Sequence, residues 1–316
     1  MKEKRLFIAS IKIVCVFVVL VLFLLAAQRL LVPKYVGKMA EGSLIEEYYD
    51  ADKENDVIFF GDSEVYYNFS PKCLEEKYGL KAYVRGSANQ TMWQSYYLLL
   101  DTLRYETPKV VVLSVSSLMK NEVESEPYNR MTIDGMEWSQ YKYECIRESM
   151  LLEETYISYV FPIFRYHDRW SEIKTEDFKY FFEKPDVSYR GYIERSEIVP
   201  MGQLPSVKPL ENYDLSEKAM NYLDNIRNLC QEKNIKLILV KSPSQYPHWY
   251  EEWDEQVESY GDKHNIKYVN LMEVVDEIGL DFSVDSFDGG LHLNATGAIK
   301  NTEYFGNIIK EEINNE

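Results

Sequence analysis

The nine residues VIFFGDSEV, Val57 to Val65, decide the fold of this chain. A short apolar run of β-favouring residues ends abruptly in Gly-Asp-Ser, and the segment that follows can begin a helix. In an α/β sheet, ligands bind just beyond the carboxyl ends of the strands. Ser63 at such a turn would expose its hydroxyl and backbone N–H to one substrate atom, as serine nucleophiles usually do. Because Gly, Asp and Ser are also ordinary turn residues, this interpretation needs a partner elsewhere.

The partner lies near the other end of the chain, in SFDGGLHLNATG, residues 286–297. His292 is one of only four histidines, and two aspartates lie just upstream of it. A catalytic base needs a carboxylate that fixes its tautomer, and Asp288, four residues before His292, can supply one. Asp285 is the alternative. The competing interpretation is a surface loop whose aspartates form turns and whose Asn294 or Thr296 caps the final helix, and both interpretations can hold together.

Apolar runs alternate with helical stretches along most of the chain, which predicts a mostly parallel sheet with helices on both faces. The expected strands are Val57–Phe60, Ala82–Val84, Val110–Leu113, Leu237–Val240 and Tyr268–Asn270. The clearest helices are Thr91–Tyr105, Ser216–Glu232 and Tyr250–His264. Both candidate catalytic loops then fall at carboxyl strand ends, on one side of the sheet.

The order of Gly-Asp-Ser near the start and Asp…His-Leu-Asn near the end resembles the SGNH hydrolases, also called GDSL esterases and lipases. The resemblance covers roughly residues 56–316 and implies a flavodoxin-like three-layer α/β domain. It implies that Ser63 is the nucleophile and an oxyanion-hole donor, that His292 is the base, and that the nearby aspartate orients it. Gly86, in AYVRGSANQ after the second apolar strand, matches the glycine of the family's second block.

Two blocks depart from the family's pattern. After the third strand the family usually shows Gly-x-Asn-Asp, whereas this chain reads SVSSLMKN. Asn89 or Gln90, in the preceding loop, is the expected replacement for the missing side-chain donor of the oxyanion hole. In the fourth block, the common Asp-x-x-His spacing has one extra residue here. A lost oxyanion-hole donor typically costs a hundred- to a thousand-fold in rate, so this departure bears on activity.

Within the superfamily, the chain is most similar to membrane-anchored, extracytoplasmic members from Gram-positive bacteria, and distantly to the D-alanyl-lipoteichoic acid biosynthesis protein. Residues 86–115 and FPIFRYHDRW, residues 161–170, carry this likeness. It implies acyl transfer or deacylation on a cell-surface polysaccharide or teichoic-acid-like polymer, with a membrane acyltransferase as a further candidate partner.

The amino terminus agrees with that location. Residues 6–32 are almost continuously apolar, and residues 8–27 are long enough to cross a bilayer if Lys12 reaches the interface. The basic residues at the start favour a cytoplasmic amino terminus, although Arg29 and two lysines beyond the span weaken that bias. A cleaved signal peptide is the competing interpretation. We expect a retained anchor over residues 1–35, a stalk over 36–55 and an extracytoplasmic domain over 56–316.

Composition narrows the remaining function classes. The 316-residue chain carries a net charge of −17, which argues against nucleic acid as a partner, since phosphate binding needs clustered Lys and Arg. The four cysteines are widely spaced and form no zinc pattern, and no paired-histidine helix or calcium loop occurs. No glycine-rich phosphate loop follows a strand. We therefore expect neither a metal nor another cofactor.

Residues 121–209 do not alternate and are rich in aromatic side chains. Inserted directly after the third strand, they are expected to form a helical cap at the edge of the active site. Arg165, His167 and Arg169 are candidate substrate-binding residues there, for sugars or an anionic group. The simpler interpretation is a packing subdomain whose aromatics form its own small core.

The sequence therefore predicts a membrane-anchored serine esterase or O-acyltransferase that uses Ser63, His292 and Asp288 on acyl groups of a cell-surface glycopolymer. The alternative is a non-catalytic accessory protein of the same fold that binds a glycan or a membrane acyltransferase, which the missing third-block asparagine favours. A cytosolic esterase would require the opposite orientation of the anchor.

Overall fold

The computed structural model describes residues 2–33, 42–183 and 186–314, and contains a five-stranded parallel sheet with the strand order β2-β1-β3-β4-β5. The strands are β1 Val57–Gly61, β2 Ala82–Gly86, β3 Val110–Ser114, β4 Lys236–Lys241 and β5 Lys267–Asn270. All five strands expected from the sequence are present, and every pair is parallel. The prediction of a mostly parallel α/β fold is confirmed.

The central strands are buried on both faces, as continuous runs of β-branched and aromatic residues require. Alternate residues enter two separate hydrophobic clusters. Ile58 and Phe60 belong to one cluster, whereas Val57 and Phe59 belong to the other. The sheet is therefore the middle of three layers, with a core on each side.

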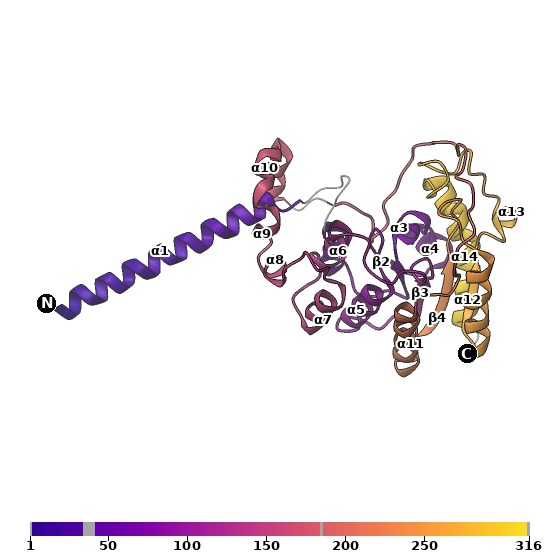
Figure 1. The fold of residues 1–316 in the computed structure, drawn as a ribbon, viewed down its shortest axis with the longest axis horizontal. Coiled ribbons are helices and arrows are strands. Elements are labelled where there is room, and N and C mark those ends of the chain that lie inside the picture. Colours follow the sequence, from indigo (N-terminus) through magenta and orange to yellow (C-terminus); the bar gives the residue numbers. More distant parts are fainter. Residues whose placement is uncertain (1, 34–41, 184–185, 315–316) are drawn as a thin grey trace.

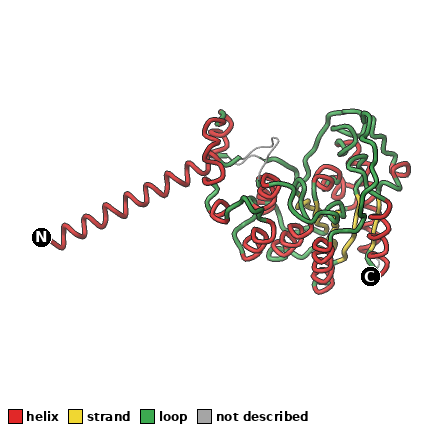
Figure 2. Tube along the Cα trace, viewed as in Figure 1, coloured by secondary structure: helices red, strands yellow, loops and turns green. Residues whose placement is uncertain are grey.

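Helices from distant parts of the sequence cover the two faces (Figure 2). One face is covered by α5 Met92–Thr102, α11 Glu217–Glu232 and α12 Glu251–His264. The other is covered by α3 Ser63–Asn68, α4 Pro71–Tyr78 and α14 Ala295–Asn314. The three helices predicted from the sequence all lie on the first face.

The insertion after β3 is helical over its first two thirds. Its helices are α6 Glu126–Ile133, α7 Gln140–Ser149, α8 Tyr156–Val160, α9 Ile163–Tyr166, the 3-10 helix η1 His167–Glu172 and α10 Thr175–Phe182. The short α13 Val275–Ile278 lies outside it, after β5. Within the insertion, α7 packs on α5, whereas α9, η1 and α10 pack on the amino-terminal helix. The helix α6 contacts the loop after β2 through a hydrogen bond between Thr132 Oγ1 and Ser87 Oγ, and the expected cap over the active-site edge stays a prediction.

The amino-terminal helix α1 spans Lys2–Leu31 and projects from the body of the molecule (Figure 1). By length and composition, its segment Lys4–Leu31 is a candidate membrane span. The segment expected to be a stalk differs from the prediction. Residues 34–41 lie outside the described residues, but α2, Ser43–Asp50, is packed into the body with Leu44, Ile45 and Tyr48 buried.

Candidate active site

The turn between β1 and α3 places Ser63 at the first residue of a helix. Asp62 caps this helix, since its Oδ1 accepts a hydrogen bond from the backbone N–H of Glu64 at 3.0 Å. Gly61 allows the end of β1 to lie close to the end of β3, because a Cβ at that position would lie only 2.5 Å from the Cβ of Ser114. Ser63 is partly exposed while both of its neighbours are buried. Its hydroxyl is therefore presented at the carboxyl edge of the sheet.

Ser63, His292 and Asp288 form a continuous hydrogen-bonded chain. The distance between Ser63 Oγ and His292 Nε2 is 2.7 Å, and that between His292 Nδ1 and Asp288 Oδ2 is 2.6 Å. The backbone N–H of His292 also donates to Asp288 Oδ1 at 2.8 Å. With Nδ1–H donated to the carboxylate, Nε2 is free to accept the serine proton, which is the arrangement of a serine–histidine–aspartate triad.

The structure brings Asp288, and not Asp285, to the histidine. Asp285 is almost fully buried and accepts hydrogen bonds from Lys300 Nζ at 2.7 Å and from the backbone N–H of Asp281 at 2.8 Å. It therefore holds the base of the loop in place. The expected helix cap by Asn294 is also present, as its Oδ1 accepts from the backbone N–H of Gly297 at 3.1 Å.

The electrostatics of Asp288 suit an orienting carboxylate. Burial raises the pKa of Asp288, but hydrogen bonds from the ring and backbone of His292 more than offset this, and the net pKa lies below its usual value. The carboxylate therefore stays charged at neutral pH. Two aromatic rings enclose the imidazole, with centroid distances of 4.9 Å from Tyr67 and 5.8 Å from Phe287.

Gly86 lies directly beside the serine turn, because the sheet register pairs it with Gly61. A Cβ on Gly86 would come within 2.9 Å of Val65 Cγ2 and 3.0 Å of the Gly61 carbonyl oxygen. Only glycine fits there without a shift, so the loop after β2 can approach the serine closely. The backbone N–H of Gly86, which is expected to donate to an oxyanion, therefore lies next to the turn that carries Ser63.

The two candidate side-chain donors are in different situations. Gln90 is fully buried, and its Nε2 donates to Ser95 Oγ at 2.9 Å and to the Arg85 carbonyl at 3.3 Å. Both amide protons are therefore donated within the fold, and Gln90 has none left to donate to a substrate. Asn89 is partly exposed, and its Oδ1 accepts from Lys120 Nζ at 2.6 Å.

Lys120 comes from the loop after β3, where the SGNH pattern has an asparagine. Because Lys120 holds the oxygen of the Asn89 amide, the Nδ2 group faces away from it. Among the described residues, this nitrogen has no hydrogen-bond partner. Asn89 is consequently the candidate that keeps a free side-chain donor. The sequence contained this signal, since SVSSLMKN includes Lys120, a lysine that can orient a neighbouring amide.

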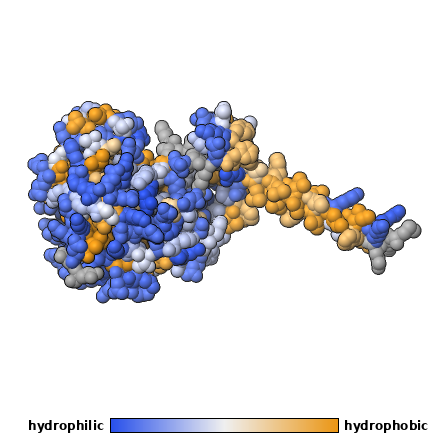
Figure 3. All heavy atoms as spheres, turned by 180° about the vertical axis from the view of Figure 1, so that it is seen from behind, coloured by the Kyte–Doolittle hydropathy of each residue, from blue (hydrophilic) through white to orange (hydrophobic). Residues whose placement is uncertain are grey.

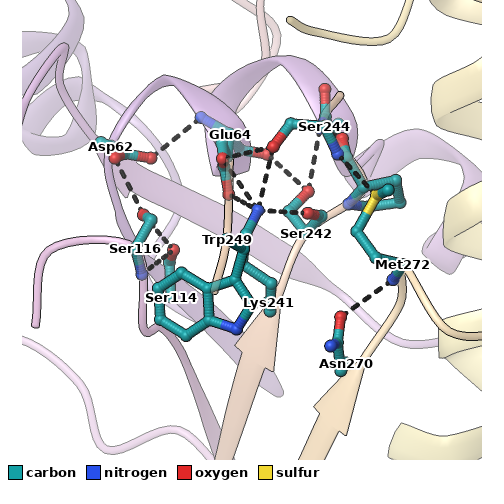
Figure 4. A network of polar contacts seen from close by, with 12 residues as sticks. Asp62, Glu64, Ser114, Ser116, Lys241, Ser242, Ser244, Trp249, Asn270 and Met272 are labelled. Atoms are coloured by element: carbon teal, nitrogen blue, oxygen red, sulfur yellow. Dashed lines mark hydrogen bonds and ion pairs between the residues drawn. The ribbon is translucent and has the colours of Figure 1, made fainter. Parts of the chain in front are cut away.

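The residue after Ser63, Glu64, forms a buried ion pair that the sequence analysis did not predict (Figure 4). Lys241, at the carboxyl end of β4, contacts both carboxylate oxygens of Glu64 at 3.0 and 2.9 Å, and both side chains are nearly inaccessible. Ser244 Oγ contacts the same carboxylate at 2.9 Å. Burial raises the pKa of Glu64, and the ammonium group of Lys241 opposes that effect. The sequence signal for this ion pair was Lys241, the charged residue that ends the otherwise apolar run LILVK.

This network connects the turn that carries Ser63, called the serine turn, to the loop that carries His292, called the histidine loop. Ser242 Oγ donates to the Glu64 carbonyl at 3.2 Å and accepts from Asn68 Nδ2 at 2.9 Å. Asn68 Oδ1 in turn accepts from the backbone N–H of Leu293 at 2.9 Å, one residue after His292. On the other side, Ser116 Oγ donates to Asp62 Oδ2 at 2.8 Å (Figure 4). The relative position of the two loops is therefore fixed by buried hydrogen bonds.

The structure does not bring Arg165, His167 and Arg169 to the triad. They lie on α9 and η1, beside the end of α1 (Figure 1). Arg165 Nε pairs with Glu126 Oε1 at 2.8 Å, and Arg169 pairs with the buried Asp177 at 2.7 Å. His167, the first residue of η1, contacts the Phe164 carbonyl in the preceding helix α9 at 3.1 Å. The prediction that these residues line the substrate site is not supported, because internal partners hold both arginines elsewhere.

An extended strap of the insertion, residues 192–200, reaches the site. The backbone N–H of Ile193 donates to the Tyr66 carbonyl at 2.9 Å, and that of Val199 donates to the Ser286 carbonyl at 3.0 Å. Arg195, between them, lies over the ring of Phe287 at 4.7 Å. The strap thus joins the serine helix to the histidine loop, and it places a cation near the ring that stacks on His292.

The chain matches no protein-family model and no curated protein. It is similar to a proposed acylhydrolase from Bacteroides fragilis, with 12% identity over 85% of this chain and 93% of that one and a TM-score of 0.42. A GDSL-like lipase from Bacteroides thetaiotaomicron covers 85% of this chain and 94% of its own, at 12% identity and a TM-score of 0.38. A proposed lipolytic protein of the G-D-S-L family from Desulfitobacterium hafniense covers 80% and 98%, at 13% identity and 0.41. Likenesses of this size carry no argument about activity, which rests on the site itself.

Proposed function

We propose that this protein is a serine esterase or O-acyltransferase in which Ser63 is the nucleophile, His292 the general base and Asp288 the orienting carboxylate. The observation that carries this proposal is the chain of 2.7 and 2.6 Å contacts from Ser63 Oγ through the His292 ring to Asp288. Its position at the carboxyl edge of a parallel sheet is where α/β enzymes bind their ligands.

The first half of the proposed reaction forms an acyl-enzyme. His292 Nε2 takes the proton of the Ser63 hydroxyl, and Oγ bonds to the carbonyl carbon of an ester. The negative charge that develops on the carbonyl oxygen is stabilised by the backbone N–H groups of Ser63 and Gly86 and by Asn89 Nδ2. The leaving alcohol departs when the carbon–oxygen bond breaks, and it takes the proton from His292.

The second half releases the acyl group. His292 removes a proton from water or from a hydroxyl of an acceptor polymer, and that oxygen attacks the acyl carbon. The bond to Ser63 breaks, and the serine oxygen takes the proton back from His292. Water as the acceptor makes the protein an esterase, whereas a polymer hydroxyl makes it an O-acyltransferase.

The proposed location is the outer face of a cell membrane, with α1 as a retained anchor and its amino terminus in the cytoplasm. Support comes from the length and apolar character of α1 and from the basic residues at its start. A substrate on a cell-surface glycopolymer agrees with this location and with the sequence resemblance to anchored SGNH proteins. The assembled triad favours catalysis over a purely accessory role, since a binding protein has no need for it.

Fluorophosphonate labelling of the full chain in detergent micelles tests this proposal. We expect the wild-type protein to be labelled and both Ser63→Ala and His292→Ala to lose the label, because the reagent reacts only with a base-activated serine. Ser206→Ala is the matched control, because Ser206 is an exposed serine near the end of the insertion, and this variant should be labelled as the wild type is. A folded wild-type protein that resists the reagent would instead favour the accessory role, for which glycan binding is the next measurement.

A further inference from the structure

The last helices of the insertion pack against the carboxyl end of α1. We call residues 156–182, from α8 to α10, the collar. Its elements α9, η1 and α10 all contact α1. Two arginines fix the junction, since Arg169 Nη1 donates to the Leu31 carbonyl at 2.7 Å and Arg29 Nε donates to the Phe181 carbonyl. Arg169 is held in turn by the buried Asp177, which also accepts from the backbone N–H of Lys174 at 2.9 Å.

The collar begins where a membrane span would end. Residues 6–25 of α1 are exposed apart from the half-buried Val21, whereas Ala26, Ala27 and Gln28 are partly covered and Leu31 is buried. At 1.5 Å per residue, a stretch of about twenty residues measures about 30 Å, which is the thickness of the hydrocarbon core of a bilayer. If the exposed stretch crosses a membrane, the collar lies at the level of the lipid headgroups.

The collar exposes large aromatic side chains that the domain leaves uncovered. Phe182 is 85% exposed and Trp170 is 72% exposed. Phe161, Phe164 and Phe178 are also exposed, and Phe178 and Phe182 are four residues apart on one face of α10. Figure 3 shows the apolar surface of α1 continuing onto the adjoining side of the molecule. Soluble proteins rarely gather so much apolar surface in one place, whereas aromatic residues concentrate at membrane interfaces.

We propose that the collar is a lipid-binding surface that lies in the boundary between headgroups and acyl chains, on the side of the membrane where α1 ends. This inference rests on the proposed anchoring by α1. The exposed charges of the collar are mixed, with Lys174 and Lys179 beside Glu172 and Glu176, so the attraction comes from apolar side chains and not from anionic headgroups. The collar thereby fixes the height and tilt of the catalytic domain above the bilayer, which a flexible stalk would leave free.

Fluorophore quenching by brominated lipid tests this surface in the full chain. On a Cys15→Ser background, single cysteines are introduced by Trp170→Cys and Phe182→Cys and labelled with a nitrobenzoxadiazole dye. The other native cysteines are buried and escape the label. Val284→Cys, at a side chain that is 46% exposed in the segment before the histidine loop, is the matched control. Thermal unfolding confirms that each variant is folded before it is reconstituted into phosphatidylcholine vesicles with bromine near the headgroup end of the acyl chains.

We expect the dye at positions 170 and 182 to lose emission about two-fold in brominated vesicles, while the dye at position 284 is unaffected. Equal behaviour at all three positions, in protein that floats with the vesicles, would overturn the collar proposal and leave the anchor standing. Protein that does not float would overturn both the anchor and the collar. Neither result affects the outcome of the fluorophosphonate labelling, which needs no membrane.

Discussion

The carboxyl edge of the sheet, which carries the triad, and the collar differ in how well the sequence predicts the positions of their side chains. At the triad edge, short motifs and sheet register place each side chain, so that Ser63 and His292 meet although 229 positions separate them. In the collar, aromatic and basic residues that suggest a ligand site instead pack around α1 or remain exposed. The difference teaches that residue type predicts function well only where the backbone position is also fixed by sequence pattern.

The two aspartates of the histidine loop give the largest expected contrast. Asp288→Asn should lower kcat by about a thousand- to ten-thousand-fold, because the imidazole loses its orienting charge and its tautomer. Asp285→Asn should lower kcat by less than about ten-fold, and should mainly reduce the free energy of unfolding by about 1–3 kcal/mol through loss of the Lys300 contact. Steady-state hydrolysis of a chromogenic acetate ester, with thermal unfolding alongside, measures both. A larger kcat loss for Asp285→Asn would reverse the assignment.

The buried ion pair behind Ser63 gives the next largest effect. Lys241→Met leaves the carboxylate of Glu64 without its cation and should destabilise the domain by about 3–5 kcal/mol. The double variant Lys241→Met with Glu64→Leu should recover much of that loss, because no uncompensated charge remains. Chemical denaturation of the full chain in micelles measures the two free energies. Equal stability of the single variant and the wild type would show that the pair does not hold the serine turn.

Asn89 tests the proposed oxyanion hole. Asn89→Ala should lower kcat about a hundred-fold with little change in KM, as expected for a donor that acts mainly in the transition state. Lys120→Met should produce a smaller loss, since it removes the partner of the Asn89 oxygen and not the donor itself. Unchanged kcat in Asn89→Ala would leave the hole to backbone N–H groups alone.

The pKa of Asp288 predicts a pH dependence of stability. Because this pKa is lowered in the folded state, the stabilisation is fully present above the unfolded value and is lost as pH falls through the folded value. The wild type should exceed Asp288→Asn in stability by about 1–2 kcal/mol near neutral pH, and the difference should shrink below about pH 4. Thermal unfolding of both proteins across this range checks the sign. A difference that grows on acidification would contradict it.

The smallest effect is expected in the collar. Arg165→Ala and His167→Ala should leave kcat and KM within about two-fold of the wild type, because neither side chain reaches the triad. Soluble ester substrate keeps the membrane out of this measurement. A large rise in KM would restore these residues to the substrate site.

Much of the fold could be predicted from sequence because β1, β3 and β4 carry apolar runs and helical stretches lie between most of the strands. Gly61, Asp62 and Ser63 indicated the serine turn, and the histidine loop followed from the spacing of Asp288 and His292. The choice of Asp288 over Asp285 needed the structure, since either carboxylate was within reach of the histidine by spacing alone.

Other features depend on contacts between distant segments, which sequence patterns do not record. Lys120 orients Asn89 across two loops, and Lys241 pairs with Glu64 across 177 positions. The role of Arg169 at the end of α1 spans 138 positions. The aromatic insertion was expected as a cap because of its place after β3. Sequence patterns did not show that α7 packs on α5 or that α9, η1 and α10 pack on α1.

The most direct test of the central claim is to locate the fluorophosphonate adduct in the intact full chain by peptide mapping and mass spectrometry. The account predicts a single adduct on Ser63, in the peptide that contains VIFFGDSEV, and none on the serines of the surrounding network. An adduct on Ser116, Ser242 or Ser244, with Ser63 unmodified, would contradict the assignment of the nucleophile.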